Sequence, residues 1–476
     1  MTPRRVLVDL SHAADGFVGV AQDIRLIFAM LARLPGVAPT GLLMPQTLHD
    51  LPRITPDGGD QVALQAGIIH WMSRAAGRTP RRSRVGQVTG PLREVLRILR
   101  RRHTTLKLRP ELLDAVWRVL FEQTLPPGER ALIGRQDFVA TDLSVARLLF
   151  RVGTLPRLSP VSLDAAGYDA VLFCNARPIT LPPGVRTYIR YHDAIPLTDA
   201  DMVSHWQTGA IHQRMVRECD PAAVFVCDSP SSVQDLALAD PRRAEHARVI
   251  PCALAPANLG GPTIAPASIF AAHRVFRALG REPAPPPPLD HAPRYVLSVS
   301  TFEPRKNFSG LVRAWERVVA RHDPDLRLVL VAGRGWLEED GLRLIAPHVA
   351  TGRLLHLQGL PPDELHALMQ QAECFVFPSF AEGFGLPPLE ALQAGASVVV
   401  SDIPVLRWTL RDAALFVDPY DVEDMAQAIV RLCVSPEREG LKASLRQRAA
   451  ATVSRFTPAT LAQEWAALLD AAPTSP

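Results

Sequence analysis

Apolar and polar residues follow two different patterns along the chain. Short apolar runs, rich in β-branched residues, are followed by longer stretches whose apolar positions recur about every 3.6 residues. This alternation is typical of an α/β protein with parallel sheets and helices on both faces. The runs that predict strands are Val6–Leu10, Ala170–Phe173, Thr187–Arg190, Val224–Cys227, Val296–Ser300, Arg327–Ala332, Leu354–Leu357, Cys374–Phe377 and Ser397–Val400. The clearest helical patterns lie at Phe308–Val319 and Asp363–Gln371.

A proline run divides this pattern into two halves. Residues 282–288 read Glu-Pro-Ala-Pro-Pro-Pro-Pro, and such a run joins neither a helix nor a central strand. We therefore expect one α/β domain over 1–288 and a second over 289–456. The last helical stretch, 457–476, is expected to pack back on the first domain. Residues 50–160 fit the alternation poorly and are expected to be an insertion in that domain.

The net charge of +4 comes from one short basic stretch. Residues 74–109 carry twelve Lys and Arg against a single acid, so the rest of the chain is net negative at −7. A helix predicted within 91–109 has an arginine face and an apolar face. It therefore either contacts anionic lipid at a membrane surface or is a surface helix with a solvated basic face. Nucleic-acid binding is not favoured, because no aromatic residues are interleaved with the arginines. The apolar face holds Leu92, Val95, Leu96 and Leu99.

Cysteine usage and the absence of long apolar runs indicate a cytoplasmic protein. The six cysteines show no C-x-x-C spacing, and several stand in apolar runs, so we expect buried free thiols and no structural zinc site. The apolar part of the N-terminus is too short for a signal peptide. No run of about 18 uncharged apolar residues occurs, so any contact with the inner face of a membrane is expected to be peripheral.

The most informative stretch, residues 375–395, reads FVFPSFAEGFGLPPLEALQAG. An apolar strand ends at Pro378, a loop with two glycines follows, and prolines then occupy the first helical positions, where a missing N–H costs nothing. The start of that helix leaves bare amides that attract a phosphate. Glu382 in the loop and Glu390 in the first helical turn suit sugar and ribose hydroxyls, because carboxylates accept strongly from them. Alternatively, Glu390 complements the helix dipole and Glu382 is a solvated loop residue.

Two adjacent cations follow the strand that opens the second half. Arg305 and Lys306 stand in the stretch EPRKN, directly after the strand and a short turn. An arginine fork and a lysine point charge both suit a diphosphate. A solvated charged turn is the alternative, and the glutamates downstream favour phosphate binding over it.

Together these stretches resemble the retaining glycosyltransferases of family 4, also called glycosyltransferases group 1, which have the GT-B fold. The resemblance covers residues 295–430, in order and at the family's spacings. It implies two Rossmann-like domains facing across a cleft, the first binding an acceptor and the second a nucleotide sugar. It also implies that Glu382 contacts the transferred sugar and Glu390 the ribose. The other donor-binding residues it implies in this half are Arg305, Lys306, Gly383, Phe384, Gly385, Leu386, Gly359 and Leu360.

The first half resembles the family more loosely. A glycine-containing turn after the first strand ends at Gly19, where the backbone could approach the donor closely; a plain strand–helix turn is the alternative. His192 follows another strand and, with Asp193, resembles the family's H-D element. The resemblance implies that His192 is catalytic and donates to a sugar hydroxyl or polarises the reacting centre, with Asp193 as its orienting neighbour.

The activity implied by the resemblance is transfer of a hexosyl residue, mannose first, to a polysaccharide or lipid-linked acceptor, as in O-antigen assembly. No D-x-D stands beside the phosphate loops, so we expect neither metal nor cofactor, with GDP-mannose as the donor. Ser300 replaces the family's glycine and Thr301 an arginine found in some members, which keeps a GT-B scaffold without turnover as the alternative. A dinucleotide-dependent dehydrogenase is not favoured, because no G-x-G-x-x-G follows the first strand.

Overall fold

The computed structural model describes residues 2–15, 19–44, 102–154, 161–198, 207–256, 264–273, 293–333 and 339–471. They belong to two compact units. The first comprises the described residues of Met1–Ala200, His205–Ala255 and Pro458–Pro476, and the second those of Pro256–Thr457. The chain leaves the first unit after Ala255, ahead of the predicted boundary at 288. The reason is that helix α11 (Pro266–His273) packs on α14 (Pro362–Gln371) and β14 (Leu354–Leu357) of the second unit.

A parallel sheet forms the centre of the first unit. Its order among the described residues is β11-β10-β9-β7-β1-β2-β5-β4, and only the β4–β5 pair is antiparallel. In chain order its strands are β1 (Arg4–Asp9), β2 (Val37–Leu43), β4 (Thr105–Lys107), β5 (Asp137–Thr141), β7 (Ala170–Phe173), β9 (Arg186–Tyr191), β10 (Val224–Cys227) and β11 (Arg248–Val249). A small parallel sheet, β3-β6-β8, is made of β3 (Arg102–His103), β6 (Val161–Leu163) and β8 (Ile179–Thr180).

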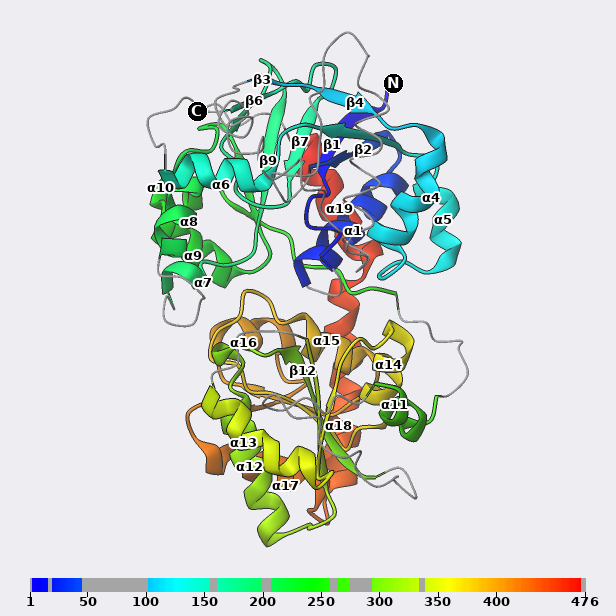
Figure 1. Ribbon diagram of the computed structural model, residues 1–476, viewed down its shortest axis with the longest axis vertical. Helices are drawn as coiled ribbons and strands as arrows, with labels where there is room; N and C mark the ends of the chain where they lie inside the picture. Colours follow the sequence, from blue (N-terminus) through cyan, green and yellow to red (C-terminus); the bar gives the residue numbers. More distant parts are fainter. Residues whose placement is uncertain are drawn as a thin grey trace, which may run out of the picture. The chain divides into compact units, whose positions relative to one another are not determined.

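Helices connect and cover these strands (Figure 1). The α-helices of the first unit are α1 (Gly19–Arg33), α4 (Leu113–Val116), α5 (Arg130–Ile133), α6 (Val145–Thr154), α7 (Ile195–Thr198), α8 (Gln207–Arg217), α9 (Pro230–Ala239), α10 (Pro241–Glu245) and α19 (Pro458–Asp470). Short turns of other helix types are η1 (Pro110–Leu112), the π-helical η2 (Trp117–Phe121) and η3 (Pro127–Glu129).

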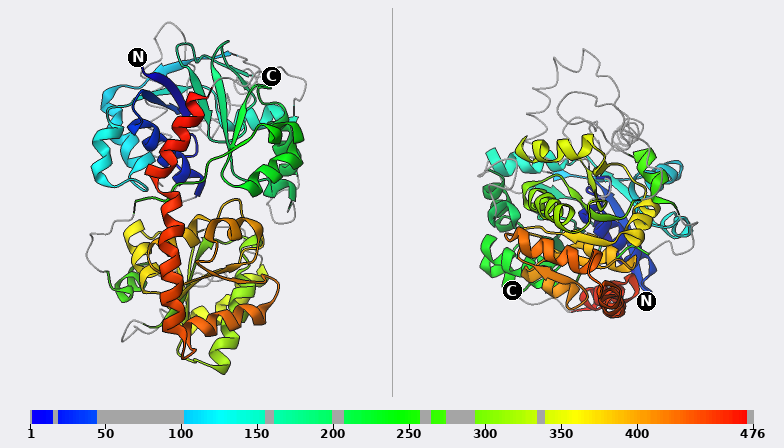
Figure 2. Two further views of the ribbon diagram at one scale, coloured as in Figure 1. Left: turned by 180° about the vertical axis from the view of Figure 1, so that it is seen from behind. Right: turned by 90° about the horizontal axis from the view of Figure 1, so that it is seen from below.

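The last helix of the chain is part of the core of the first unit. In α19, Leu461, Trp465 and Leu469 are spaced four residues apart, so they share one face, and none is more than 2% exposed. That face packs on α1, and Figures 1 and 2 show the two helices side by side. Residues that follow the second unit in sequence therefore complete the hydrophobic core of the first.

A second parallel sheet forms the centre of the second unit, in the order β14-β13-β12-β15-β16-β17. Its further strands are β12 (Tyr295–Thr301), β13 (Arg327–Gly333), β15 (Cys374–Phe377), β16 (Val398–Ser401) and β17 (Leu415–Val417). The helices not yet named are η5 (Pro304–Lys306), α12 (Phe308–Arg321), α13 (Glu339–Ala350), α15 (Leu386–Gln393), α16 (Pro404–Leu410), α17 (Val422–Cys433), α18 (Arg438–Val453) and η6 (Ser454–Phe456).

All nine predicted strands are confirmed, each within two residues of its predicted ends. The insertion predicted over 50–160 is only partly described, and the described part corrects it. Residues 102–154 supply β4 and β5 to the main sheet, with β5 pairing in parallel to β2. Strand β2 was not predicted, because Pro39 and Gly41 interrupt its apolar pattern. Gly41 is required there, since a Cβ would come within 2.4 Å of the ring of Phe138 on β5.

Two further expectations concern cysteines and membranes. All six cysteines are buried and free, as predicted. Among the described residues, no helix is long and apolar enough to cross a bilayer. Most of the basic stretch 91–109 lies outside the described residues, and its end forms strands β3 and β4.

Each sheet has one point where successive strands are added on opposite sides. In the first sheet this switch lies between β1 and β7, and in the second between β12 and β15. Loops that leave the carboxyl ends of the two strands at such a point diverge to opposite faces, so they leave a crevice where ligands of open α/β sheets bind. The loops after these strands are therefore the first places to look for a functional site.

Candidate active site

In the second unit, the loops at the switch point carry the predicted donor-binding residues. Strand β12 leads into η5, which holds Arg305 and Lys306, and β15 leads into the loop that holds Glu382. The two loops are joined by a backbone hydrogen bond, in which the amide of Phe380 donates to the carbonyl oxygen of Arg305 over 2.8 Å. Residues about 76 positions apart in the sequence thus meet at one edge of the sheet.

The side chains form a compact charge cluster at this edge. Lys306 Nζ lies 2.6 Å from Glu382 Oε1, and Arg305 Nη1 lies 3.2 Å from Glu382 Oε2. Arg305 Nε also pairs with Glu303 Oε2 at 2.8 Å. The Lys306 and Glu382 side chains are only 9% and 8% exposed, so this is not the solvated loop of the alternative interpretation. We call Glu303, Arg305, Lys306 and Glu382 the donor-side cluster.

Burial and charge act in opposite directions on this cluster. Burial raises the pKa of Glu382, but the charges of Lys306 and Arg305 outweigh it and hold that pKa below its usual value. Burial also lowers the pKa of Lys306, an effect that the negative charge of Glu382 opposes. The carboxylate and the ammonium therefore stabilise each other's charged forms at a place where neither would be stable alone.

The glycine loop leads into α15 through a backbone conformation that suits glycine. Gly385 precedes the helix with φ +90°, and a Cβ there would meet Leu406 Cδ2 at 2.5 Å. The prolines predicted at the first helical position are instead the second and third residues of the helix, Pro387 and Pro388. Phe384 is 5% exposed and packs edge-on against the rings of Trp408 and Phe456, so only its backbone can face a ligand. Gly383 is buried in the same loop, and Leu386 opens the helix.

The other predicted donor residues stand on neighbouring elements of the same unit. Glu390 is half-buried in α15, eight positions after Glu382. Gly359 and Leu360 follow β14, two strands away from β12 in the sheet, and Gly359 is exposed with φ +71°. The structure thus brings together the donor-side cluster and the start of α15. The contacts of Gly359, Leu360 and Glu390 with a nucleotide stay predictions.

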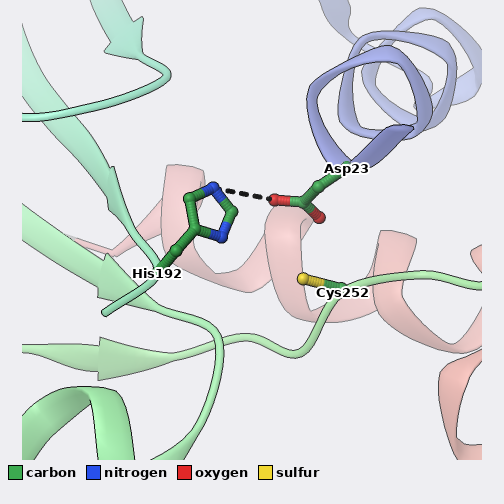
Figure 3. Close-up of side chains that lie close together, drawn as sticks. All are labelled: Asp23, His192 and Cys252. Atoms are coloured by element: carbon green, nitrogen blue, oxygen red, sulfur yellow. Dashed lines mark ion pairs between the residues drawn. The ribbon is translucent and has the colours of Figure 1, made fainter. Parts of the chain in front are cut away.

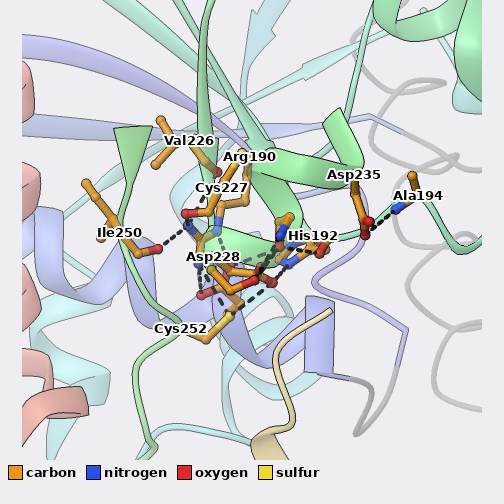
Figure 4. A network of polar contacts seen from close by, with 12 residues as sticks. Arg190, His192, Ala194, Val226, Cys227, Asp228, Asp235, Ile250 and Cys252 are labelled. Carbon is orange, nitrogen blue, oxygen red and sulfur yellow. Dashed lines mark hydrogen bonds and ion pairs between the residues drawn. The ribbon is translucent and has the colours of Figure 1, made fainter. Parts of the chain in front are cut away.

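In the first unit, His192 follows β9 and lies among carboxylates. Its Nδ1 lies 3.0 Å from Asp228 Oδ2, and its Nε2 lies 3.8 Å from Asp23 Oδ2 on α1 (Figures 3 and 4). The His192 side chain is 14% exposed, whereas both carboxylates are almost fully buried. The hydrogen bond to Asp228 fixes the ring orientation and, by placing the Nδ1 proton there, leaves Nε2 available for chemistry.

A buried arginine neutralises these carboxylates. Arg190 donates from Nε to Asp23 Oδ2 over 2.6 Å and from Nη1 to the carbonyl oxygen of Ile250 over 2.5 Å. Its Nη2 lies 3.3 Å from Cys252 Sγ (Figure 4). Burial raises the pKa of Asp228, an effect that the hydrogen bond with His192 and the charge of Arg190 partly offset. Burial also raises the pKa of Cys252 well above its usual value, so Cys252 is present as a thiol.

The predicted partner of His192 is wrong. Asp193 does not orient the imidazole: its Oδ1 accepts a hydrogen bond from the amide of Ile195 over 3.1 Å, at the start of α7. Asp228, after β10, takes that place. Sequence reasoning missed Asp228 because it lies 36 positions from His192, although an acid directly after a buried strand was a usable signal. Gly19, predicted to bind the donor, is the exposed first residue of α1, and its contact with a donor stays a prediction.

A second polar cluster, also missed from the sequence, joins β1 and β7 at the switch point of the first sheet. Asp9 Oδ2 lies 3.5 Å from Arg177 Nε and accepts a hydrogen bond from Cys174 Sγ over 3.1 Å. Burial raises the pKa of Asp9, but the charge of Arg177 and the hydrogen bonds from Ser11 and Cys174 hold it below its usual value. The cluster therefore ties together the ends of the two strands.

Solved structures confirm the predicted fold class. The chain aligns over 98% of its length with 99% of the Anabaena protein HepE solved with UDP and glucose, at a TM-score of 0.53 and 14% identity. It aligns over 98% with 98% of sucrose-phosphate synthase from Thermosynechococcus elongatus, at a TM-score of 0.51 and 17% identity. The chain has the GT-B fold, with its two Rossmann-like parallel sheets. The cleft expected between the domains stays a prediction.

Sequence comparisons then relate the second half to a known family. Residues 283–451 match the model of the family described as Glycosyl transferases group 1. The chain is 36% identical over 137 residues to O-antigen chain mannosyltransferase B of Escherichia coli, a match that covers 29% of this chain and 36% of that protein. It is 34% identical over 177 residues to phosphatidyl-myo-inositol mannosyltransferase of Mycolicibacterium smegmatis, covering 36% of this chain and 44% of that protein. The chain thus spans less than half the length of these curated relatives.

Proposed function

We propose that this protein is a retaining glycosyltransferase that moves a hexosyl residue from a nucleotide diphosphate sugar to a polysaccharide or lipid-linked acceptor. One observation carries the proposal. The donor-side cluster lies at the switch point between β12 and β15, inside the segment that matches the glycosyltransferase family. A buried carboxylate held between two cations, beside the bare amides of a helix start, suits a molecule that has both hydroxyls and a diphosphate.

The cations and the start of α15 would stabilise the leaving diphosphate. An ammonium has three donors, so Lys306 can hold Glu382 and a phosphate oxygen at the same time. Arg305 adds a second positive charge 3.2 Å from the same carboxylate. Fixed charges and amides directed at the leaving group lower the barrier without reorganising at the moment of reaction. In this proposal the protein itself neutralises the diphosphate, and no metal ion is needed for that step.

Glu382 and His192 would act on the sugar. Glu382 accepts hydrogen bonds from hydroxyls of the transferred sugar, and Glu390 accepts from the ribose. His192 presents Nε2 to the sugar or its reacting centre, since Nδ1 is held by Asp228. The glycosidic bond to phosphate breaks ahead of attack, and the leaving phosphate oxygen takes the proton of the acceptor hydroxyl. The anomeric configuration is retained on this route without a carboxylate nucleophile.

The relatives' names guide the choice of donor and acceptor. They describe mannosyltransferases, one acting in O-antigen chains and one on phosphatidyl-myo-inositol. We therefore propose GDP-mannose as the donor and a growing polysaccharide or a lipid-linked glycan as the acceptor. The proposal places the protein in the cytoplasm, where residues 91–109 would contact the inner face of the membrane.

Donor binding and transfer test the proposal together. Purified protein in EDTA is melted with GDP-, UDP- and dTDP-sugars, because a ligand that binds the folded state raises the melting temperature. We expect a selective rise that Lys306→Ala loses and Lys442→Ala keeps. Lys442 pairs with Glu373 at 2.8 Å, at the start of β15 rather than its carboxyl end, and its side chain is 7% exposed, so it is a matched buried ion pair away from the site.

Transfer is then measured with the donor that binds. Release of nucleoside diphosphate that depends on added acceptor, with a retained α-anomer detected by NMR, supports the proposal. Donor binding without any turnover would instead support a GT-B scaffold that assists polysaccharide assembly. No thermal shift with any donor at millimolar concentration would contradict both.

A further inference from the structure

Three side chains from distant parts of the first unit converge beside His192. Asp23 comes from α1, His192 from the loop after β9, and Cys252 from the loop after β11. One ligand atom from each, a carboxylate oxygen, a ring nitrogen and the sulfur, lies within 4.8 Å of the other two. Figure 3 shows the carboxylate of Asp23, the ring of His192 and the sulfur of Cys252 close together. Among the described residues, this combination of nitrogen, sulfur and oxygen ligands occurs at this one place.

We propose that Asp23, His192 and Cys252 form a binding site for Zn²⁺. A mixed set of imidazole, thiolate and carboxylate is typical of zinc, whereas magnesium and calcium take oxygen ligands. Three protein ligands leave the fourth tetrahedral position for water, as in open zinc sites. No motif in the sequence indicates this site, because its ligands lie far apart along the chain.

The surroundings of His192 match those of a metal-bound histidine. Such a histidine donates its other ring N–H to a carboxylate, which fixes its tautomer and raises its basicity. Here Nδ1 lies 3.0 Å from Asp228 Oδ2, and Asp228 is in turn held by the hydroxyl of Ser232. Nε2, the atom that faces Asp23, is therefore the nitrogen with a lone pair to offer.

The nitrogen and the carboxylate oxygen need only a small contraction. His192 Nε2 and Asp23 Oδ2 lie 3.8 Å apart. Bonds of about 2.0–2.1 Å from a tetrahedral ion place two such ligand atoms about 3.3 Å apart. Since the His192 side chain is the partly exposed member, at 14%, the ion can reach the site by passing its ring.

Arg190 would remain in place when the ion binds. Its Nη2 lies 3.3 Å from Cys252 Sγ and 3.2 Å from Asp23 Oδ1, so it can donate to a metal-bound thiolate and to the carboxylate oxygen that does not bind the ion. Its Nε donates to Asp23 Oδ2 over 2.6 Å, so that oxygen would bind the ion through its other lone pair. In the loaded site, the negative charges of Asp23, Asp228 and the Cys252 thiolate balance Arg190 and Zn²⁺. As the sulfur–zinc bond forms, the S–H bond breaks and its proton passes to the solvent.

Occupation of this site would remove His192 from catalysis. This consequence rests on the proposed function, because Nε2 is the atom that the transferase mechanism uses. The bound ion would act as an inhibitor of transfer, and the donor-side cluster would still bind the nucleotide sugar. Zinc binding itself does not depend on that mechanism, so the two can be tested separately.

The test measures metal binding without substrates. Full-length protein, stripped with EDTA and desalted, is titrated with Zn²⁺ in competition with a chromogenic chelator, and with Co²⁺ as a spectroscopic probe. We expect one ion per chain and a thiolate-to-cobalt absorption band in the near ultraviolet. Cys252→Ser should lose the band, and Asp228→Asn should weaken zinc binding about 10–100-fold, the usual cost of losing such a supporting carboxylate.

A matched thiol variant provides the control. Cys219→Ser removes another buried cysteine of the first unit, whose Sγ donates to the carbonyl oxygen of Met215 over 3.1 Å, and should change neither the band nor the affinity. Circular dichroism and thermal melting confirm that each variant is folded. The proposal is overturned if the wild-type protein binds no zinc at micromolar concentration, or if Cys252→Ser and Asp228→Asn bind it as tightly as wild type. Transfer measured in EDTA tests the proposed function independently.

Discussion

The ammonium of Lys306 lies 2.6 Å from the carboxylate of Glu382, although the two residues come from loops after different strands of the second sheet. Both side chains are less than a tenth exposed. Taking two charges out of water is costly, and a buried pair is weak evidence of stabilisation. The pair is better explained by function, because it holds a carboxylate and two cations ready at the point of the sheet where ligands bind.

The first prediction concerns the ammonium. Replacing Lys306 with methionine leaves Glu382 with Arg305 alone, and should lower the free energy of unfolding by about 3 kcal/mol, the cost of breaking a buried pair. Transfer should fall about 100-fold or more, as when one transition-state donor is removed. Urea unfolding and initial rates measure the two effects. The control, Lys442→Met, should lose comparable stability and keep its activity per folded molecule. An equal loss of transfer in the control would contradict the role of Lys306.

The second prediction separates the two glutamates. If Glu382 acts on the sugar, Glu382→Gln should abolish the extra affinity for the nucleotide sugar over the nucleoside diphosphate alone. If Glu390 acts on the ribose, Glu390→Gln should weaken both ligands alike. Calorimetric titration with both ligands makes the comparison. The assignment fails if the two variants show the same pattern.

A pH dependence follows from the pKa of Glu382. The pKa of Glu382 is lower in the folded protein than its usual value of 4.5 in the unfolded chain. The ionised carboxylate therefore stabilises the folded protein at pH values above 4.5, and this stabilisation is lost as the pH falls through the lower pKa of the folded protein. Wild type should therefore be more stable than Glu382→Gln at pH 7, and the difference should shrink as the pH falls below 4.5. Urea unfolding midpoints between pH 7 and pH 3 measure it. A difference that stays constant over this range would show that the charge of Glu382 contributes nothing.

Sequence and structure agree well at the donor side and poorly around His192. The donor-side cluster could be predicted because its residues stand within short motifs directly after strongly apolar strands. The partners of His192 could not, since Asp23, Asp228 and Cys252 come from three separate segments that only the sheet order brings together. Strand β2 could not be predicted for a similar reason. Gly41 interrupts its apolar pattern, and only glycine fits there beside the ring of Phe138 on a neighbouring strand.

The fourth prediction uses two glycines at opposite ends of α15. Gly385 and Gly395 both have positive φ, of +90° and +87°, but only Gly385 has a side chain, Leu406, within 3 Å of a built Cβ. Each change to alanine should cost about 1–2 kcal/mol for the left-handed backbone. Gly385→Ala should cost about 1–3 kcal/mol more for the clash and should also weaken donor binding, since it moves the amides of the helix start. Denaturation and donor titration of both variants give the comparison; equal effects on donor binding would contradict it.

The fifth prediction concerns the orientation of His192. Asp228→Asn should lower kcat with little change in the donor KM, because the imidazole loses its fixed tautomer and not its contact with the donor. Asp193→Asn should keep kcat, since Asp193 Oδ1 accepts from a backbone amide and an asparagine oxygen can do the same. Steady-state kinetics over a pH series for the two variants test this. Equal losses of kcat in the two variants would show that Asp193 is needed at the site as much as Asp228 is.

The most direct measurement is the melting temperature of the wild-type protein, Lys306→Ala and Lys442→Ala with GDP-, UDP- and dTDP-sugars in the presence of EDTA. The account predicts that one class of nucleotide sugar stabilises wild type and Lys442→Ala and leaves Lys306→Ala unchanged. If no nucleotide sugar stabilises the wild-type protein, or if Lys306→Ala responds as wild type does, the donor-side cluster does not bind a sugar donor and the proposed function is wrong.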